Sequence, residues 1–532
     1  MPAERRLIPR IGPWEAMRSE FRWTLPPDFN IAHACCDSWA EADPSRVALV
    51  HVGDKGVSEW TYSRLCDAAS RFASALSAQG VVRGDRVAIV LGQCPEALIA
   101  HFAAMRLGAI TVPLFTLFGP EALQYRLSDS GARAVVTDLA SLDKLMSLDL
   151  PDVRAVFCTE PSSVRSFWDD IVKASPARAA PTTPHDPAVM IYTSGTTGPP
   201  KGALHAHRVL LGHLPAIELH HEGFGQPGDI GWTPADWAWI GGLFDMALPC
   251  LYYGVPLVSR RFRKFTPDEA WRLIADRGVR NMFLPPTALK MMRQAPVPHD
   301  VDVRSIGSGG ESLGDDLRDW GREVLQAPIN EFYGQTECNL VVSSSSTEYR
   351  SGCMGRAVPG HVVAVIDGAG NPVPDGEEGE IAVSTPDPVM FLRYWRQPDK
   401  TEEKFTGRWM RTGDLGRRDA DGFFSFVSRD DDVITSSGYR IGPSEIEHCL
   451  AGHPDVVLAA AVGEPDPVRT EVVVAYVVLR PGASTDGLPD DLIARVRQRI
   501  SPHVAPRRVV IVDSLPTTAT GKIMRRELRE RP

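Results

Sequence analysis

The sequence predicts an α/β fold with a large N-terminal domain, residues 1–430, and a small C-terminal α+β domain, residues 431–532. Three observations lead to this prediction. A chain of 532 residues is too long for a single hydrophobic core. Apolar strand-like runs alternate with helical stretches, which is typical of parallel sheets covered by helices. A dense charged stretch at residues 429–432 separates apolar strands, as domain boundaries often do.

The alternation occurs twice and predicts two helix-covered sheet subdomains within the large domain. In the first pass we expect strands at 47–50, 85–90 and 109–113 and helices at 61–79 and 95–107. In the second we expect helices at 270–276 and 313–324 and a strand at 281–284. From about Ser343 short β segments such as 362–366 and 379–383 predict a small β-barrel.

Composition excludes several classes of function. The net charge of -10 disfavours non-specific nucleic-acid binding, and no apolar run is long enough to span a membrane. Residues 1–20 lack the apolar core of a secretory signal. Nine scattered cysteines without a CxxC pair indicate reduced thiols, no structural zinc and a cytoplasmic location.

A loop at residues 192–202 carries the strongest chemical signal. It follows an apolar run, Ala188–Ile191, and combines glycines and hydroxyl side chains with Lys201. Backbone N–H groups of such a loop converge on an anion, so we predict a cradle for a triphosphate. It is not the Walker pattern, because Pro200 precedes the lysine and Gly202 follows it. The alternative is a flexible surface loop.

Other stretches give weaker evidence of a binding site when each is taken alone. Residues 305–312 form a second glycine-rich turn, and residues 329–337 combine an aromatic residue with carboxylates, as an adenosine site with a metal ligand would. Three tryptophans lie within residues 232–239. Such a cluster more often belongs to a hydrophobic core than to a binding site, although the neighbouring glycines suggest the wall of a cavity. The basic run at 259–264 fits a solvated face as well as a phosphate contact.

In this order and spacing, from about residue 30 to the end, these stretches resemble the AMP-forming adenylating enzymes. The segments 21–23 and 233–239 are similar to those of the medium-chain and aryl acyl-CoA synthetases. The resemblance implies that a carboxylic acid reacts with ATP to give acyl-AMP and pyrophosphate, and that CoA then takes the acyl group. The implied cofactors are ATP, Mg²⁺ and CoA. A carboxylate is already ionised at neutral pH, so such a site needs cations and oriented donors and no general base.

The resemblance also implies roles for single residues. Lys522, Lys201 and Thr336 would be catalytic, Glu337 and Thr193 would bind the metal, and Asp414 would bind the ribose hydroxyls. The implied ATP and AMP contacts are Thr193, Ser194, Gly195, Thr196, Thr197, Gly198, Lys201, Gly310, Glu311, Ser312, Glu331, Phe332, Tyr333, Gly334, Gln335, Thr336, Asp414, Phe426, Arg429, Arg440 and Lys522.

In this family the C-terminal domain is mobile and turns between the two half-reactions about a hinge, here Asp431. The implied CoA contacts are Ser437, Gly438, Tyr439 and Arg497. Pro516 and Lys522 have the spacing at which relatives are acetylated, so a protein lysine acetyltransferase and deacylase are candidate partners. Thr435 and Thr470 depart from the usual family residues, and neither position touches the chemistry.

The predicted acyl pocket comprises Trp237, Trp239, Ile240, Gly241, Gly309 and Gly334. Acetate-activating relatives carry tryptophan at the position of Gly334 and β-branched residues at the other two glycines. We therefore expect a medium-chain, branched-chain or aromatic acid in place of acetate. The alternatives are an adenylating enzyme that passes the acyl group to a carrier protein or another acceptor, and a non-catalytic nucleotide sensor. The sequence leaves open whether the protein forms a homo-oligomer.

Overall fold

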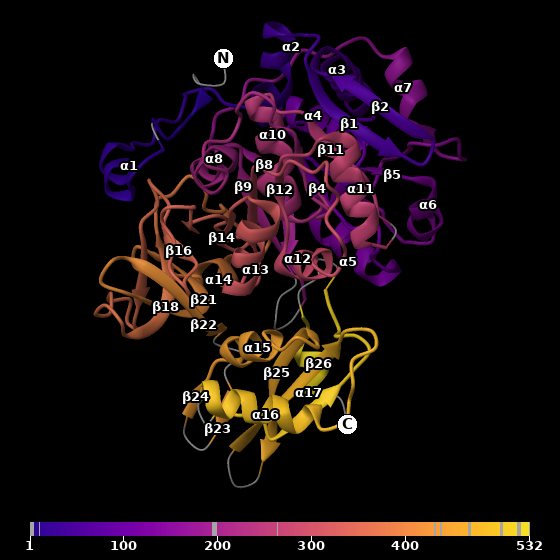
Figure 1. Cartoon of the computed structure of the whole chain (residues 1–532). Helices are drawn as coiled ribbons and strands as arrows, with labels where there is room; N and C mark the ends of the chain where they lie inside the picture. The colour runs from indigo at the N-terminus through magenta and orange to yellow at the C-terminus, as the bar shows by residue number, and fades with distance from the viewer. Residues whose placement is uncertain are drawn as a thin grey trace.

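The structure is a computed structural model that describes residues 5–9, 11–193, 199–262, 264–429, 432, 434–436, 439–466, 470–500, 504–518 and 523–530. The described residues form three β-sheets, two in the large N-terminal part and one in the smaller C-terminal part (Figure 1). This arrangement confirms the predicted α/β class with a large and a small part.

The first sheet follows the predicted alternation of strands and helices. Its strands lie in the order β19-β9-β8-β4-β3-β5-β6-β7, and every pair from β8 to β7 is parallel. They are β3 (Arg86–Val90), β4 (Ile110–Pro113), β5 (Ala132–Thr137), β6 (Ala155–Cys158), β7 (Arg165–Ser166), β8 (Pro187–Thr193), β9 (Lys201–Ala206) and β19 (Arg393–Tyr394). Its helices are α3 (Tyr62–Ala78), α4 (Pro95–Arg106), α5 (Pro120–Ser130), α6 (Leu139–Met146) and α7 (Phe167–Lys173). Thr61 caps α3 by accepting the Arg64 N–H at 3.3 Å, as its sequence predicts.

The second sheet has a parallel half and an antiparallel half. The parallel strands are β1 (Val47–Gly53), β11 (Leu257–Ser259), β10 (Gly231–Trp232), β12 (Asn281–Phe283), β13 (Ser305–Gly309) and β14 (Ile329–Tyr333), with β2 (Gly56–Thr61) at the edge. The predicted strand at 47–50 therefore belongs here and not to the first sheet. The helices of this half are α8 (Val209–His220), α9 (Ile240–Gly242), α10 (Leu248–Tyr253), α11 (Pro267–Arg277), α12 (Pro286–Met292) and α13 (Asp315–Trp320), with π-helical turns η3 (Leu243–Ala247) and η4 (Gly321–Leu325).

The predicted β-barrel is corrected by the strand pairing. The strands β15 (Val342–Ser343), β16 (Gly355–Ala357), β22 (Phe423–Arg429), β21 (Trp409–Arg418), β18 (Glu378–Ser384) and β17 (Val363–Ile366) continue the second sheet in that order, and β20 (Phe405–Thr406) pairs with β21. Because β15 pairs with β14, this antiparallel half extends the parallel half. In the described residues no pairing closes it into a barrel. The short helix α14 (Pro398–Glu402) follows β19.

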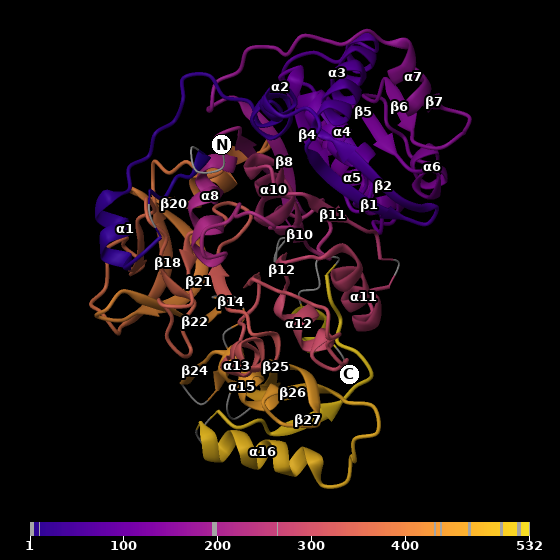
Figure 2. The same cartoon turned by 45° about the horizontal axis from the view of Figure 1, so that its top comes forward.

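The C-terminal part has its own sheet, and the described strands after Arg429 pair only with one another. They are β23 (Ile434–Ser436), β24 (Tyr439–Ile441), β25 (Val456–Asp466), β26 (Thr470–Leu479) and β27 (Arg508–Ile511), with helices α15 (Pro443–Ala451), α16 (Leu488–Arg499) and α17 (Arg525–Arg529). Figure 1 shows this part below α12 and α13, and in Figure 2 it lies below α12. The exact division at residues 430 and 431, and the motion about it, remain predictions.

One hydrophobic core joins the first two sheets. It contains Phe72 and Phe102 from helices of the first sheet together with Leu214 and Leu251 from helices of the second. The N-terminal helices α1 (Trp14–Glu20) and α2 (Ser38–Ala42), with the π-helical turn η2 (His33–Asp37), also contribute buried side chains to it. Among the described helices, none has the length and apolar character needed to cross a bilayer.

The fold brings the predicted nucleotide loops together at strand ends. β13 and β14 are parallel neighbours with Gly309 opposite Phe332, so the residues that follow these two strands lie side by side. Ligands of open α/β sheets bind at such carboxyl ends. The loop between β8 and β9 is a hairpin connection, because β9 returns antiparallel to β8 with Thr193 opposite Lys201.

Helix α8 packs tightly against the segment that leads into β19. A Cβ on Gly212 would lie 2.5 Å from the backbone N and Cα of Val389. Gly212→Ala should therefore lower the free energy of unfolding by about 1–3 kcal/mol, although alanine favours a helix by about 1 kcal/mol. Urea unfolding followed by circular dichroism measures the loss. The control Gly368→Ala, with nothing within 4 Å of the added Cβ, should stay within about 0.5 kcal/mol of wild type. Equal midpoints for both variants would contradict the prediction.

Candidate active site

The flanks of the phosphate loop are held by tyrosines. Tyr192, the residue before Thr193 on β8, donates its hydroxyl to Oδ2 of Asp129 at 2.6 Å. Tyr125 donates to the carbonyl of Pro200 at 3.0 Å, directly before Lys201. Asp129 and Tyr125 both lie on α5, so this helix fixes the two ends of the loop. The predicted contacts Ser194, Gly195, Thr196, Thr197 and Gly198 lie outside the described residues.

Lys201 lies half-buried at the start of β9. Burial lowers the pKa of its ammonium group, and the nearby Glu337 carboxylate opposes that shift. The Nζ atom lies 4.6 Å from the centroid of the Tyr394 ring, in a cation–π contact. The lysine is thus held beside the loop, and no carboxylate of the described residues makes an ion pair with it, as suits a phosphate-binding cation.

Glu337 and Tyr394 form the centre of this cluster. Tyr394 donates its hydroxyl to Oε1 of Glu337, and both side chains are buried. The backbone carbonyl of Glu337 accepts the Phe391 N–H at 2.8 Å, which fastens the same two segments together. Sequence reasoning missed Tyr394, because nothing in the local pattern reveals that β19 pairs with β9.

A second cluster surrounds Asp414 on β21. Tyr333 donates its hydroxyl to Oδ2 of Asp414 at 2.6 Å, and burial together with this carboxylate raises the pKa of Tyr333 well above its ordinary value. Gln335 donates to the carbonyl of Thr412 at 3.0 Å. Lys404, which the sequence did not indicate, donates to the same carbonyl at 3.2 Å and to Oε1 of Gln335 at 3.3 Å. The structure therefore brings together three predicted nucleotide residues: Tyr333, Gln335 and Asp414.

Two further predicted contacts lie on the strand beside this cluster. The backbone of Arg429 pairs with Asp414 and that of Phe426 with Gly416 across β21 and β22. These pairings bring Arg429 to the cluster, and Phe426 lies beyond it along the strand.

The second glycine-rich turn, which carries the predicted nucleotide contacts Gly310, Glu311 and Ser312, is held by charged groups on β14 and α13. Glu331 accepts the Leu313 N–H at 3.2 Å and makes an ion pair with Arg318 at 2.8 Å. Glu311 accepts the Thr287 hydroxyl at 2.8 Å. Gly310 has a φ of +92°, a conformation that favours glycine. The carboxylate of Glu331 thus holds the end of the loop formed by Gly310, Glu311 and Ser312.

The predicted acyl-pocket glycines do not leave open space where a side chain would begin. A Cβ on Gly309 would lie 2.4 Å from the Phe332 ring, and one on Gly241 would lie 2.9 Å from Phe283. A Cβ on Gly334 would lie 2.3 Å from the backbone N of Leu340, so a tryptophan there would displace backbone. The glycines allow close packing of neighbours at these three points, and the acyl pocket itself stays a prediction.

The side chains that pack against Gly241 and Gly309 are Trp239, Phe283 and Phe332, which we name the aromatic wall. Phe283 lies 5.5 Å from both Trp239 and Phe332 between ring centroids. The Phe332 ring also stacks on His220 at 4.9 Å between ring centroids, and its role as a nucleotide contact stays a prediction. Trp237 and Ile240 are buried in the same region. Sequence reasoning missed Phe283, although a buried strand ending beside the second glycine-rich turn could have indicated it.

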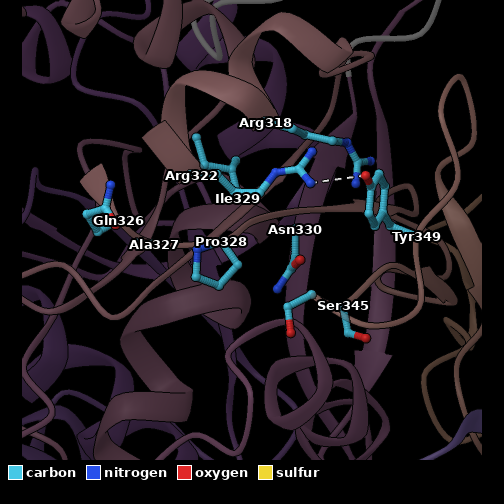
Figure 3. Close-up of a pocket in the computed structure, with 10 residues that line it drawn as sticks. Arg318, Arg322, Gln326, Ala327, Pro328, Ile329, Asn330, Ser345 and Tyr349 are labelled. Carbon is cyan, nitrogen blue, oxygen red and sulfur yellow. Dashed lines mark hydrogen bonds between the residues drawn. The ribbon is translucent and has the colours of Figure 1, made fainter. Parts of the chain in front are cut away.

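A cavity of about 210 Å³ lies elsewhere, at the start of β14 (Figure 3). Arg322 reaches across it to the Tyr349 hydroxyl at 3.0 Å. Its lining is Arg318, Arg322, Gln326, Ala327, Pro328, Ile329, Asn330, Ser345, Ser346 and Tyr349. None of the predicted site residues lines it, so this cavity is separate from the two carboxylate clusters.

The predicted C-terminal residues are only partly described. Tyr439 and Arg440 lie on β24, and Arg497 lies on α16. Arg525 makes ion pairs with Asp432 at 3.1 Å and with Glu447 at 2.7 Å, and so ties the segment after the predicted catalytic lysine to the segment after the predicted hinge. Asp431, Ser437, Gly438 and Lys522 lie outside the described residues.

Comparison with known proteins agrees with this geometry. The AMP-binding enzyme family model matches residues 36–395, and the model of the AMP-binding enzyme C-terminal domain matches residues 445–522. The acetyl-coenzyme A synthetase of Bacillus subtilis (strain 168) is 32% identical, over 94% of this chain and 90% of its own. The mitochondrial acyl-coenzyme A synthetase ACSM2 of Rattus norvegicus is 33% identical, over 95% of this chain and 92% of its own.

A solved structure extends the likeness to three dimensions. The crystal structure of a benzoate CoA ligase from Burkholderia xenovorans LB400 has a TM-score of 0.85 and 30% identity, over 94% of this chain and 100% of that chain. The chain belongs to the AMP-binding enzyme family. Within it, the chain is an AMP-forming acyl-CoA ligase, because these two relatives and this solved structure, each matched over at least 94% of the chain, are acyl-CoA synthetases or a CoA ligase.

The contact between Tyr333 and Asp414 gives a testable prediction. Tyr333→Phe keeps the ring and removes the hydroxyl that orients the buried carboxylate. AMP affinity should fall about tenfold, because a hydrogen bond to a charged group is lost. Isothermal titration calorimetry with AMP measures the change. Tyr349→Phe, which removes a hydroxyl at the separate cavity, should bind AMP as wild type does. Unchanged affinity in Tyr333→Phe would show that Asp414 needs no such support.

Proposed function

We propose that this ligase activates a medium-chain, branched-chain or aromatic carboxylic acid with ATP and transfers the acyl group to CoA. The observation that carries the proposal is the cluster of Lys201, Tyr394 and Glu337 beside Thr193, which combines a cation with a buried carboxylate at one end of the loop. A cation for phosphates and a carboxylate for a metal are what the transfer of an adenylyl group requires.

In the first half-reaction a carboxylate oxygen of the acid attacks the α-phosphorus of ATP, and the bond from that phosphorus to the leaving pyrophosphate breaks. Two anions must approach each other, so the groups that matter are those that neutralise charge. Lys201 would hold the β- and γ-phosphates, while Lys522 and Thr336 would contact the α-phosphate. Asp414 would accept from the ribose hydroxyls, as a carboxylate suits two O–H donors.

Glu337 and Thr193 offer the hard oxygen ligands that Mg²⁺ prefers. Tyr394 donates to Oε1 of Glu337, and no described residue makes a hydrogen bond to Oε2, so one carboxylate oxygen keeps its lone pairs for a cation. Thr193 donates its hydroxyl to the Lys201 carbonyl at 3.4 Å, which likewise leaves the hydroxyl oxygen as an acceptor. When bound there, Mg²⁺ would offset the charge of the β- and γ-phosphates.

In the second half-reaction the CoA sulfur attacks the acyl carbon, a C–S bond forms, and the bond from that carbon to the phosphate oxygen of AMP breaks, so that AMP leaves with the oxygen. The thiol proton passes to water. Ser437, Gly438, Tyr439 and Arg497 would contact CoA after the C-terminal domain turns about Asp431. The same turn would remove Lys522, so one small domain would serve both steps in succession.

The aromatic wall supports an apolar acid. The side chains nearest to Gly241 and Gly309 are Trp239, Phe283 and Phe332, and none carries a charge that would bind a second carboxylate. The rat relative is an acyl-coenzyme A synthetase and the solved neighbour is a benzoate CoA ligase, which fits such an acid. The bacterial relative acts on acetate by its name, and the acid therefore needs a direct test.

Location and modification are further parts of the proposal. The nine cysteines are free thiols, which supports action in the reducing cytoplasm. Acetylation of Lys522 by a protein acetyltransferase would remove the charge needed for the first half-reaction.

Lys522 gives a prediction that separates the two half-reactions. Lys522→Ala should reduce acyl-AMP formation at least about 100-fold, because a cation between two anions is lost. Thioester formation from supplied acyl-AMP should stay within a few-fold of wild type. Pyrophosphate release and acyl-CoA formation, measured separately, check this. Equal loss of both steps in a folded variant would contradict the assignment.

The acid itself is tested with a panel of acetate, hexanoate, isobutyrate and benzoate, each with and without CoA. Each buried methylene contributes about 0.8 kcal/mol, so kcat/KM for hexanoate should exceed that for acetate by roughly two orders of magnitude. Acyl-CoA should form only with CoA present. Preference for acetate would overturn the proposed acid class, and product formation with a different acceptor would overturn the role of CoA.

A further inference from the structure

The most informative residue outside the predicted set is Tyr394. It lies on β19, which pairs antiparallel with β9, with Tyr394 opposite Ala203. The neighbouring N–H groups of Leu392 and Trp395 donate to the Leu204 and Gly202 carbonyls, both at 2.7 Å. The side chain is 1% exposed. Its position is therefore set by the backbone of the strand that begins with Lys201.

Tyr394 makes two contacts of different character. Its ring receives the ammonium group of Lys201 at 4.6 Å, and its hydroxyl donates to Oε1 of Glu337. One neutral side chain thus holds a cation through its π face and an anion through its O–H group.

The consequence lies in what Tyr394 prevents. A lysine and a glutamate this close would ordinarily form an ion pair, in which each neutralises the other. Within the described residues, no contact within 4.0 Å joins the Lys201 ammonium group to a carboxylate, although the charge of Glu337 acts on the lysine. The aromatic ring contacts the ammonium group without offsetting its charge, while the hydroxyl occupies one oxygen of the glutamate and leaves the other for a ligand.

We propose that Tyr394 is the positioning residue of the metal–triphosphate half of this site. It holds Lys201 and Glu337 apart, so that the lysine can bind phosphate and the glutamate can bind Mg²⁺. This inference rests on the proposed function, because it takes the roles of Lys201 and Glu337 from it.

The test uses the full-length protein and binding in place of turnover. Tyr394→Phe keeps the ring beneath Lys201 and removes only the hydroxyl. The Mg²⁺ concentration that half-saturates binding of the ATP analogue AMP-PNP, measured by calorimetry, should rise about tenfold or more. AMP binding, which lacks the β- and γ-phosphates, should change less than twofold. Tyr394→Leu also removes the ring, so AMP-PNP affinity should fall further even at saturating Mg²⁺.

Two controls separate positioning from structure. Tyr349→Phe removes a tyrosine hydroxyl at the separate cavity and should leave the Mg²⁺ dependence unchanged. In a Glu337→Gln background, Tyr394→Phe should have no further effect on the Mg²⁺ dependence, because the hydroxyl acts through that carboxylate. Equal loss of AMP and AMP-PNP binding, or a full effect that persists in the Glu337→Gln background, would overturn the proposal.

Failure of the proposed function would look different. Wild-type protein that binds no AMP-PNP, or releases no pyrophosphate with any acid, would contradict the function itself. Wild-type protein that does both, together with a Tyr394→Phe variant of unchanged Mg²⁺ dependence, would contradict only the role of Tyr394.

Discussion

The backbone ladder formed by β8, β9 and β19 is the constraint on which the site depends. It sets Thr193 opposite Lys201 at the two ends of the phosphate loop, and it places Tyr394 beside the strand that Lys201 begins. Strand pairing fixes side chains to alternate faces, so a shift by one residue would turn Tyr394 away from both partners. The chemistry of the loop therefore follows from register as much as from residue type.

Tyrosines, and not only cations, hold the carboxylates around this site. Tyr394 donates to Glu337, Tyr333 to Asp414 and Tyr192 to Asp129. Burial and the neighbouring carboxylate raise the pKa of each of these tyrosines, so the proton stays on the phenol and each hydroxyl remains a donor. Glu331 differs, because Arg318 neutralises it. A carboxylate meant for a metal gains from a neutral partner, whereas Glu331 holds its loop through the ion pair with Arg318.

The sequence predicted the order of elements better than their partners. The helices at 61–79 and 95–107 and the strand before the loop were predicted closely, because hydrophobic period and caps are local properties. The membership of 47–50 in the second sheet and the open continuation of β15 from β14 depend on pairing between distant segments, which local patterns do not encode. The same limit explains which site residues the sequence predicted. Recognisable motifs contain Thr193, Lys201, Glu337, Tyr333 and Asp414. The importance of the other three, Tyr394, Phe283 and Lys404, depends only on their neighbours in space.

The two halves of the site come from different sheets, and the contact of Tyr394 with Glu337 is important because it joins them. Thr193, Lys201 and Tyr394 belong to the first sheet, while Tyr333 and Asp414 belong to the second and Glu337 follows β14 of that sheet. Arg208, before α8, donates to the carbonyls of Pro388 at 2.7 Å and Met390 at 2.9 Å, and so anchors the segment that leads to Tyr394. A small displacement of one sheet relative to the other would lengthen the tyrosine–glutamate hydrogen bond before it disturbed either sheet, because hydrogen bonds weaken steeply with distance and angle. The bond is thus sensitive to the alignment of the two sheets, in which the phosphate and metal ligands face the same triphosphate, and it helps to maintain that alignment.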